Sequence, residues 1–571
     1  MSASSRSLPP LRLYADALRH MTARQLLYRP RRLLSPRVLA SGTRLRDPGA
    51  WLPLAAGLAV DRVPQSAPAP APETTGEYSS VGCQRRFRDE PAFWRAGDDG
   101  LLFAFQLHGF AELSRYASTE PRAEHDLFWS CVIASWLEHE GSPSMPGWHP
   151  YPMSGRIAAW CSALSRGGWP VALQQQMLRS LTRQAAVLAR CIEHDIGGNH
   201  VLRNATGLTF AGVCLGDARL ERRGLDLLRN ELPRQILADG GHEERSPAYH
   251  RGVLCDLVDI ATLLGRASRP VPKWLVSAQQ QMTAWERAMR GPDGRLPLLN
   301  DAWEGPSEPS SRSRDPISVL RSSGYVVLRH AGDQAILDVG LVAPAHLPPH
   351  AHADALSFVL WADGRPLITD PGSFTYSGEE RRGFRGTASH NTVEVDGLDQ
   401  CELWGDFRAA FMPRVELCEI ENHDDVTMVV GRHDGYRRLA DPVDHQRTFC
   451  WLPEDGLVVI DELRSKRHHQ IRSRLHLAPG VSARDGQVGP MRLGVLGPGP
   501  PHKVRAGRYS PFIGQAVPIE VIERPLQAGP RVPVGWALLR PGARAILEGR
   551  RLVVQRADGR TLTLEVKAPP D

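Results

Sequence analysis

The chain has 571 residues and a formal net charge of +6, and its 42% hydrophobic and 23% charged residues are typical of a folded globular protein. This length exceeds what one hydrophobic core holds and predicts roughly two to four domains. The sequence has no run of about 18 apolar residues, so we expect no transmembrane helix. The arginines are spread along the chain, so the mild positive charge suits an acidic ligand but indicates no nucleic-acid-binding stripe.

The N-terminal segment, residues 1–80, is predicted to be an extension and linker outside the folded domains. A short basic helix is expected at about 14–34, and the Pro/Ala-rich stretch at 63–76 cannot form a core. The first residues are basic but lack the apolar segment and small-residue cleavage site of a secretory signal peptide. We therefore expect a cytoplasmic location, with the periplasm as the alternative.

The cysteines also indicate a reducing compartment. There are nine of them, scattered singly and without a CxxC pair, so the sequence predicts no disulfide framework. Four lie within apolar helical patterns and are interpreted as core thiols: Cys161, Cys191, Cys214 and Cys255.

Residues 81–310 have the hydrophobic period of helices. Apolar residues recur at helical spacing in a series of segments joined by short Gly- or Pro-rich connections. The predicted helices lie at about 124–140, 152–166, 171–195, 200–215, 217–236, 248–266 and 272–290. Many antiparallel helices with short loops predict an α/α array, here an incomplete α/α toroid.

Beyond the polar, Pro/Ser-rich break at 304–316, the period changes to two. Short apolar runs are separated by Gly, Asp and Pro turns, a pattern typical of strands. The predicted strands lie at 325–330, 334–342, 356–362, 391–397, 426–433, 447–452, 456–463 and 561–566. Residues 311–571 are therefore predicted to form an antiparallel β-sandwich, most simply of two sheets, which makes the chain a multidomain α+β protein.

A polar cluster opens one of these strands, because His350, His352 and Asp354 alternate just before an apolar run. In a strand they would share one face, where polar groups are costly unless they have partners. The turn at 363–364 should fold Asp370 back toward them, and His390 opens a later strand. Two imidazoles and a carboxylate at strand ends predict a zinc site; the alternative is a set of hydrogen-bonded structural groups.

Two polar loops in the helical half carry further candidates. In one, Asn199 and His200 follow a Gly pair and open a helix. In the other, Ser246 and a following proline form a helix N-terminus, with Tyr249 in the first turn, where the helix dipole favours a tyrosinate. A general acid/base role is one interpretation of this tyrosine, and capping plus packing on a neighbouring helix is the other.

At this point the chain resembles a known family. The segments "WHPYPMSGRIAAW", "NHVLRNATGL", "GGHEERSPAYHRGVL", "HAHADALSFVLWADGRPLITDPGSFTY" and "FRGTASHNTVEVDGLDQ" are similar to signature segments of the heparinase II/III-like polysaccharide lyases. The similarity keeps its order from about residue 93 to 405. It implies an α/α toroid followed by an antiparallel β-sandwich, and β-elimination at a uronic acid residue of an acidic glycan.

The resemblance also implies roles for individual residues. Asn199 matches the residue that neutralises the substrate carboxylate, Tyr249 the catalytic acid/base, and His350 the assisting second base. Relatives carry Asn or His at the neutralising position, so the adjacent His200 remains an alternative. The family's structural zinc ligands match His352, Asp370 and His390. The residues expected to bind substrate are His200, Arg156, Glu243 and Trp404.

Two other functions remain open from the sequence. One is a metal-dependent glycan hydrolase that uses the two histidines with Asp370, and Glu243 or Glu244 as the base. The other is a non-catalytic glycan-binding protein of a surface-polysaccharide pathway. The expected partner is an acidic poly- or oligosaccharide and not a nucleic acid; the sequence is compatible with a homodimer and does not identify the polymer.

Overall fold

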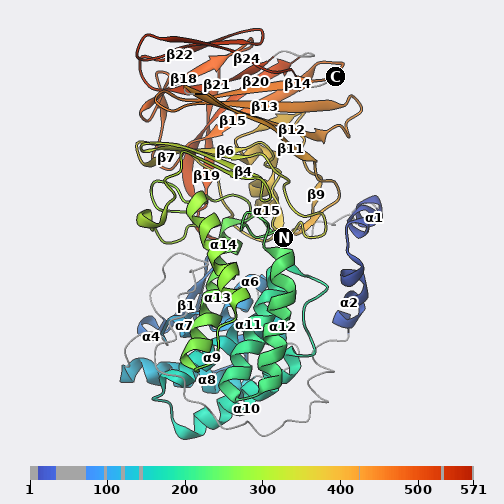
Figure 1. The fold of residues 1–571 in the computed structure, drawn as a ribbon. Coiled ribbons are helices and arrows are strands. Elements are labelled where there is room, and N and C mark those ends of the chain that lie inside the picture. The colour runs from blue at the N-terminus through green and yellow to red at the C-terminus, as the bar shows by residue number, and fades with distance from the viewer. Residues whose placement is uncertain are drawn as a thin grey trace.

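The helices and strands of the chain occupy separate halves of the molecule (Figure 1). The structure is a computed structural model that describes residues 11–33, 72–95, 100–116, 122–139, 146–423, 425–528 and 533–568. The helical half comes first in the chain and the β-rich half second, which confirms the predicted toroid followed by a sandwich. None of the described helices is long and apolar enough to cross a membrane.

The helical half is built around α11, Gly198–Leu215, which is buried on nearly every side between neighbouring helices. Its small and apolar residues allow this, because a helix without a polar face is stable only when surrounded. The other helices are α5 (Pro91–Trp94), α6 (Gly100–Gly109), α7 (Ala111–Tyr116), α8 (Ala123–His139), α9 (Pro150–Arg166), α10 (Val171–Leu188), α12 (Ala218–Gln235), α13 (Pro247–Arg266) and α14 (Lys273–Met289). Each predicted helix is present, with bounds that differ by a few residues, except that α10 ends seven residues before the predicted 195.

The N-terminal segment differs from the prediction in two ways. Two helices, α1 (Leu11–Arg19) and α2 (Ala23–Leu33), replace the single basic helix. The short elements α4 (Pro72–Thr75), β1 (Glu77–Ser80) and β2 (Cys83–Arg86) follow, and Tyr78 and Val81 belong to the core of the helical half. The predicted boundary at residue 80 is therefore several residues late. Residues 63–71 of the predicted linker lie outside the described residues.

The β-rich half contains more antiparallel sheets than the two that the sequence predicts, and these sheets are stacked. Within the described residues, one sheet contains β3 (Ile317–Leu320), β4 (Tyr325–His330), β5 (Asp333–Asp338), β6 (Phe358–Ala362) and β7 (Arg365–Ile368). The largest contains, in order, β11 (Val415–His423), β12 (Val426–Tyr436), β13 (Val443–Leu452), β14 (Gly456–Arg464), β21 (Val534–Leu539), β18 (Met491–Leu496), β17 (Gln487–Val488) and β16 (Ala483–Arg484). A smaller sheet contains, in order, β19 (Lys503–Tyr509), β20 (Val517–Ala528), β15 (His469–His476) and β8 (Val393–Val395). Another contains β22 (Arg544–Glu548), β23 (Arg551–Gln555) and β24 (Thr561–Glu565).

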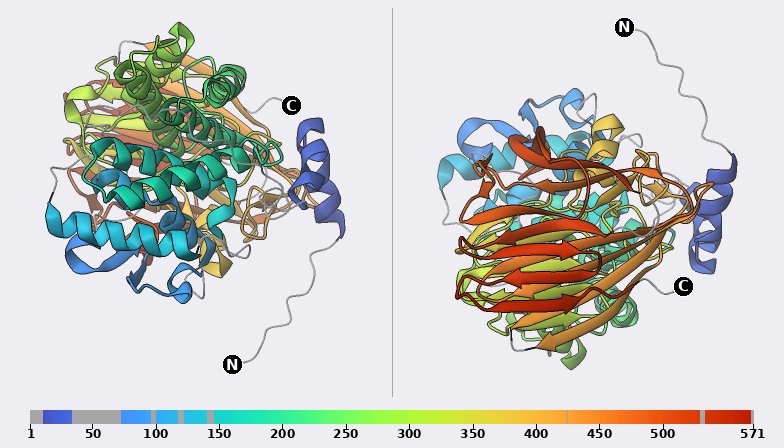
Figure 2. Two further views of the ribbon diagram at one scale, coloured as in Figure 1. Left: turned by 90° about the horizontal axis from the view of Figure 1, so that it is seen from below. Right: turned by 90° about the horizontal axis from the view of Figure 1, so that it is seen from above.

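The sheet β3–β7 joins the two halves because both of its faces are buried. Along β4, Tyr325 and Val327 contact the α14 side, where Trp285 lies, while Val326 and Leu328 face the largest sheet. This alternation follows from the two-residue period of a strand. The layers therefore run from α14 through β3–β7 and the β11–β14 sheet to β22–β24, and Figure 2 shows the stacked strands from above.

The polar cluster before β6 lies in a loop, and the prediction that it belongs to the strand is wrong. Residues 347–357 form turns, and the strand begins only at Phe358. The predicted hairpin itself is confirmed, because β6 and β7 pair in antiparallel register with Ala362 opposite Arg365. Asp363 and Gly364 have the positive φ values that this tight turn needs.

Close packing of α11 against α12 depends on Gly224. A Cβ at this position would meet the side chain of Thr209 and would lie 2.8 Å from the carbonyl oxygen of Ala205. We expect Gly224→Ala to lower the free energy of unfolding by about 1–3 kcal/mol through overpacking. The matched control is Gly252→Ala on α13, where no atom lies within 4 Å of the added Cβ. Because alanine has the higher helix propensity, this change should raise the free energy of unfolding by about 1 kcal/mol. Urea unfolding of both variants measures the difference; equal effects would contradict this account.

Candidate active site and metal centre

The buried carboxylate of Asp301 joins the two halves of the molecule. It lies in the segment between α14 and β3 and is fully buried. His350 Nδ1 lies 2.8 Å from one of its oxygens, and His352 Nε2 lies 3.0 Å from the other. The hydroxyl of Ser373 donates to it at 2.9 Å, and the guanidinium of Arg381, from α15 (Gly378–Arg385), binds both oxygens.

These contacts keep Asp301 ionised. Burial alone would raise the pKa of the carboxyl, but the ion pair with Arg381 and the hydrogen bonds from the two histidines outweigh it and hold the pKa well below its usual value. A buried ion pair of this kind is stable only when both partners are present, because either one alone is an uncompensated charge. Asp301 therefore fixes the positions of four side chains at once: His350, His352, Ser373 and Arg381.

Tyr249 and His350 are brought into direct contact. Their ring centroids are 3.9 Å apart, although one residue is in the first turn of α13 and the other is in the loop before β6. The hydroxyl of Tyr249 lies 2.8 Å from the hydroxyl of Tyr376. The rings of Tyr249 and Trp303 meet edge-on, with centroids 5.7 Å apart. The N-cap is as predicted, with Ser246 Oγ accepting from the backbone N–H of Tyr249 at 3.3 Å.

The tyrosinate that the helix N-terminus would favour is not supported. Burial, followed by the nearby Tyr376 and Asp301, raises the pKa of Tyr249 well above its usual value. The hydroxyl is therefore protonated at rest, because the helix dipole is a small effect beside the loss of solvent. Tyr249 is arranged as a proton donor.

Asn199 lies next to this pair through a shared neighbour, Glu244. The amide of Asn199 donates to both oxygens of Glu244 at 2.9 and 2.8 Å, and its backbone N–H donates to one of them at 2.9 Å. His350 Nε2 lies 3.9 Å from the same carboxylate. Gly198, with a φ of +53°, is required here because a Cβ would collide with Glu244.

His200 points elsewhere, although it is the next residue along the chain. Its Nδ1 lies 3.0 Å from a carboxylate oxygen of Glu193, and its ring lies against Tyr151. Burial would raise the pKa of Glu193, but His200 and other neighbours outweigh it and lower the pKa to about 2. Asn199, and not His200, therefore shares a carboxylate neighbour with His350.

The structure does not support the prediction that Arg156 binds substrate. Its side chain is fully buried in α9, where it donates to the side chain of Gln184 and to the carbonyl oxygens of His108 and Gly147. A ligand cannot reach it in this conformation. Arg156 has a structural role in the helical half.

Trp404 is also unavailable as a stacking surface for a sugar. It belongs to the small hairpin of β9 (Leu403–Trp404) and β10 (Arg408–Ala409), and α1 covers it. Leu13 packs against the indole, Tyr14 meets it edge-on at 4.8 Å, and the guanidinium of Arg408 lies over it at 4.7 Å. The sequence could not reveal this cover, because the two segments are far apart in the chain.

Glu243, the remaining predicted substrate-binding residue, lies at the rim of the same region. It is mostly buried, and one of its oxygens lies 3.6 Å from His346 Nε2. Burial, then the charges of Glu244 and Glu231, raises the pKa of Glu243 to about 8. In the adjacent Glu244, burial acts in the same direction, but His242, His350 and the hydrogen bonds from Asn199 outweigh it and lower the pKa.

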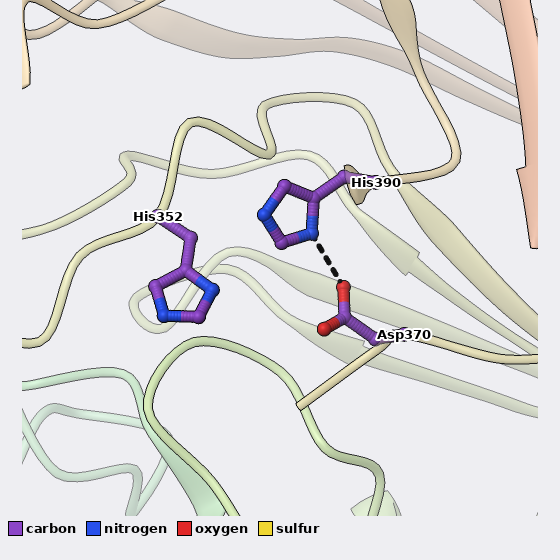
Figure 3. Close-up of side chains that lie close together, drawn as sticks. All are labelled: His352, Asp370 and His390. Carbon is purple, nitrogen blue, oxygen red and sulfur yellow. Dashed lines mark hydrogen bonds and ion pairs between the residues drawn. The ribbon is translucent and has the colours of Figure 1, made fainter. Parts of the chain in front are cut away.

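The three predicted metal ligands come together. His352, Asp370 and His390 are fully buried, and each offers one ligand atom within 4.8 Å of the others (Figure 3). His390 Nδ1 lies 2.7 Å from Asp370, and His352 Nε2 is held by Asp301. Within the described residues, His352 Nδ1 and His390 Nε2 have no hydrogen-bond partner. Buried imidazole nitrogens normally have a partner, and these two are suitable metal ligands.

The charges around this cluster fit a cation. Burial lowers the pKa of His352 to about 4, so its imidazole is neutral and able to bind a metal. Asp354 is buried close by, and neither of its oxygens has a hydrogen-bond partner among the described residues. Burial would lower the pKa of His390, but the nearby Asp370 and Asp354 outweigh it and raise the pKa, so the cluster favours positive charge.

Three residues of the site have no signal in the sequence. Asp301 is a single aspartate before a polar break, Arg381 belongs to a helix that looks charged and solvent-exposed, and Tyr376 has no spacing that links it to Tyr249. Each acquires its role only from contacts between segments 49 or more residues apart, as in Asp301 with His350 and Tyr376 with Tyr249. Spacing along one element cannot reveal such pairs.

Comparison with known proteins shows similarity over much of the chain. The chain matches the family profile "Heparinase II/III N-terminus" over residues 111–315 and "Heparinase II/III-like, C-terminal" over residues 312–496, together more than half of its length. A heparin-sulfate lyase of Bacteroides stercoris is 24% identical over 50% of this chain and 46% of the relative. The FtsZ-localized protein C of Caulobacter vibrioides is 28% identical over 69% of this chain and 73% of the relative.

A solved structure shows the same fold. The crystal structure of heparinase III superposes with a TM-score of 0.68 at 17% identity and covers 85% of each chain. The chain spans about half the length of the heparin-sulfate lyases that it matches. Because the sequence identity to this structure is only 17%, the structural similarity shows a shared fold.

The Asp301–Arg381 pair yields a stability prediction. Arg381→Met leaves a buried carboxylate without its main counter-charge and should lower the free energy of unfolding by about 3–5 kcal/mol. Arg382→Met is the matched control: this neighbouring side chain is 57% exposed, so the change should be within about 0.5 kcal/mol. Denaturant unfolding of the two variants compares them. A loss below about 1 kcal/mol in Arg381→Met would show that the pair is not structural.

Proposed function

The chain belongs to the heparinase II/III-like family, and on that premise we propose that it is a polysaccharide lyase acting on uronate-containing acidic glycans. It would cleave by β-elimination and leave 4,5-unsaturated uronate ends. The observation that carries the proposal is the contact between Tyr249 and His350, whose ring centroids are 3.9 Å apart, beside Asn199. An elimination requires a proton donor and a proton acceptor at the same site.

The two residues would have complementary roles in proton transfer. Tyr249 is protonated at rest because its pKa is raised, so it can give a proton to the leaving oxygen O4. With His350 Nδ1 donating to Asp301, the other nitrogen, Nε2, carries the lone pair and can take the proton from C5. The electron pair from the broken C5–H bond forms the new double bond as the bond from C4 to O4 breaks.

Asn199 is the candidate for holding the substrate carboxylate while C5 is deprotonated. The amide nitrogen of Asn199 donates to both carboxylate oxygens of Glu244. A substrate carboxylate would compete with Glu244 for this amide. The interaction would strengthen as charge develops in the transition state, which would raise turnover more than affinity.

We also propose that His352, Asp370 and His390 bind a zinc ion. Two imidazoles and a carboxylate are donors that suit zinc, and the unpartnered buried nitrogens support this. The ion would crosslink the loop before β6 to the ends of β7 and β8 and so hold His350 in place. Its role would be structural, because the proton transfers use side chains that lie outside the cluster.

The hydrolase alternative fits the geometry less well. It needs both histidines of the loop on one metal, but His350 binds Asp301 and stacks on Tyr249. Of its two candidate bases, Glu244 is held by Asn199 and Glu243 lies 3.6 Å from His346 Nε2. The non-catalytic alternative has a relative whose name, FtsZ-localized protein C, mentions no enzyme activity. Incubation with a panel of uronate polymers decides between the three. A lyase gives ultraviolet-absorbing unsaturated ends, a hydrolase gives new reducing ends without them, and a binding protein gives neither.

The first activity prediction concerns Tyr249→Phe. Removing the hydroxyl removes the proton donor, and we expect the elimination rate to fall by roughly 100- to 10,000-fold at an unchanged melting temperature. Tyr376→Phe is the matched control, because it removes the hydroxyl 2.8 Å away and should keep a rate within about tenfold of wild type. The rate of ultraviolet absorbance measures both. If the two variants exchange behaviour, the acid is Tyr376.

The second prediction separates the two histidines of the loop. Both contact Asp301, so His350→Ala and His352→Ala each remove one hydrogen bond to it. His352→Ala should also release zinc and lower the melting temperature further, since a structural metal contributes folding free energy. His350→Ala should keep the metal and lose the elimination rate.

Elemental analysis and thermal unfolding of both variants check this prediction. Loss of metal from both would bring His350 into the metal site and favour the hydrolase. A wild-type protein purified from zinc-containing medium that carries no metal would refute the zinc proposal.

A further inference from the structure

The two N-terminal helices present an apolar stripe to solvent. On α1, the positions Leu11, Tyr14, Ala15 and Leu18 follow the spacing i, i+3, i+4, i+7, and on α2 the positions Ala23, Leu26, Leu27 and Pro30 repeat it. All eight side chains are exposed. The leucines are the most unusual, with Leu11 at 86%, Leu18 at 52%, Leu26 at 46% and Leu27 at 67% exposure. We call these eight residues the N-terminal apolar stripe.

The opposite sides of both helices hold them to the rest of the molecule. Leu13 packs into the cluster with Trp404 and Ala410, and the buried Gln25 donates to the carbonyl oxygens of Ile196 and His346. These partners come from the helical half and from the β-rich half. The leucines of the stripe therefore lie away from these contacts, while Tyr14, at its edge, also meets Trp404. Figure 2 shows both helices at the outer edge of the molecule.

The charge beside the stripe is strongly positive. Residues 11–33 contain six arginines and one aspartate, and Arg12, Arg19 and Arg29 are exposed. Apolar leucines on one side of a helix, with arginines beside them, are the composition of helices that lie in the interface of an anionic lipid layer. Long arginine side chains can keep their charge at the headgroups while their stems lie along the apolar surface.

The size of the stripe argues for lipid rather than for a protein partner. A stable protein interface uses roughly 20–30 residues a side, and this surface offers eight. An interfacial helix needs only its apolar face in the headgroup region, and its affinity comes from leucine burial plus attraction to anionic lipid. Neither helix needs to leave the body for this contact, because the stripe is already exposed.

We infer that α1 and α2 dock the protein onto an anionic lipid surface through the N-terminal apolar stripe. The contact is peripheral, and its chemistry is that of phosphate headgroups above an acyl layer. The bound orientation is fixed, because the helices are attached to both halves of the molecule. The inference is independent of the proposed lyase activity, since no residue of the stripe belongs to the candidate active site.

The test is flotation of the full chain with lipid vesicles. Vesicles of phosphatidylglycerol and phosphatidylcholine should carry the wild-type protein, vesicles of phosphatidylcholine alone should carry at least about fivefold less, and added salt should weaken binding. The double variant Leu18→Glu/Leu27→Glu should lose at least about tenfold in partitioning. The matched control is Leu101→Glu/Leu127→Glu, which changes two leucines on the helical half that are 60% and 66% exposed, and it should float like wild type.

A second variant guards against a folding defect. Arg19→Gln/Arg29→Gln leaves the leucines in place and should weaken flotation several-fold on the anionic vesicles. Melting temperatures of all variants should equal that of wild type. The inference is overturned if wild type does not float with anionic vesicles, if the stripe variant floats as well as the control, or if light scattering shows that the stripe instead joins two copies of the chain.

Discussion

The buried ion pair between Asp301 and Arg381 is the interaction on which the candidate site depends. Asp301 comes from the segment that leaves the helical half, whereas Arg381 and both histidines come from the β-rich half. A carboxylate in a dry interior needs every one of its hydrogen bonds, because a partly paired charge is costly. The two halves are therefore joined where the chemistry is located, and a shift of one relative to the other would break the site.

This arrangement explains how two histidines only two residues apart can have different roles. Each uses one nitrogen for Asp301, and the turn between them directs the rings to different neighbours. His350 lies against Tyr249, whereas His352 lies 5.2 Å from the ring of His390. One carboxylate thus fixes the tautomer and orientation of both rings. The candidate proton acceptor and the candidate metal ligand share a support and are coupled through it.

The N-terminal helices add a second connection between the halves, on the outside of the molecule. Gln25 contacts the loop before Asn199 and the loop before His350, and α1 covers Trp404. Docking this segment on a lipid surface would place that side of the molecule, with the loops before Asn199 and His350, toward the lipid. A glycan substrate would then have to approach from another side. The position of α1 and α2 thus bears on both location and substrate access.

The sequence by itself determined what depends on neighbours along the chain. The change from helical to strand period placed the two halves, Ser246 marked the start of α13, and the turn at Asp363 gave the hairpin. Motif resemblance brought together His352, Asp370 and His390 correctly. Only the tertiary structure decided which distant groups meet: it buried Arg156, covered Trp404, paired Asn199 with Glu244 and made Asp301 the centre of the site. Hydrophobic period and turn chemistry act over a few residues, whereas the partner of a buried charge is set by segments that only the folded chain brings together.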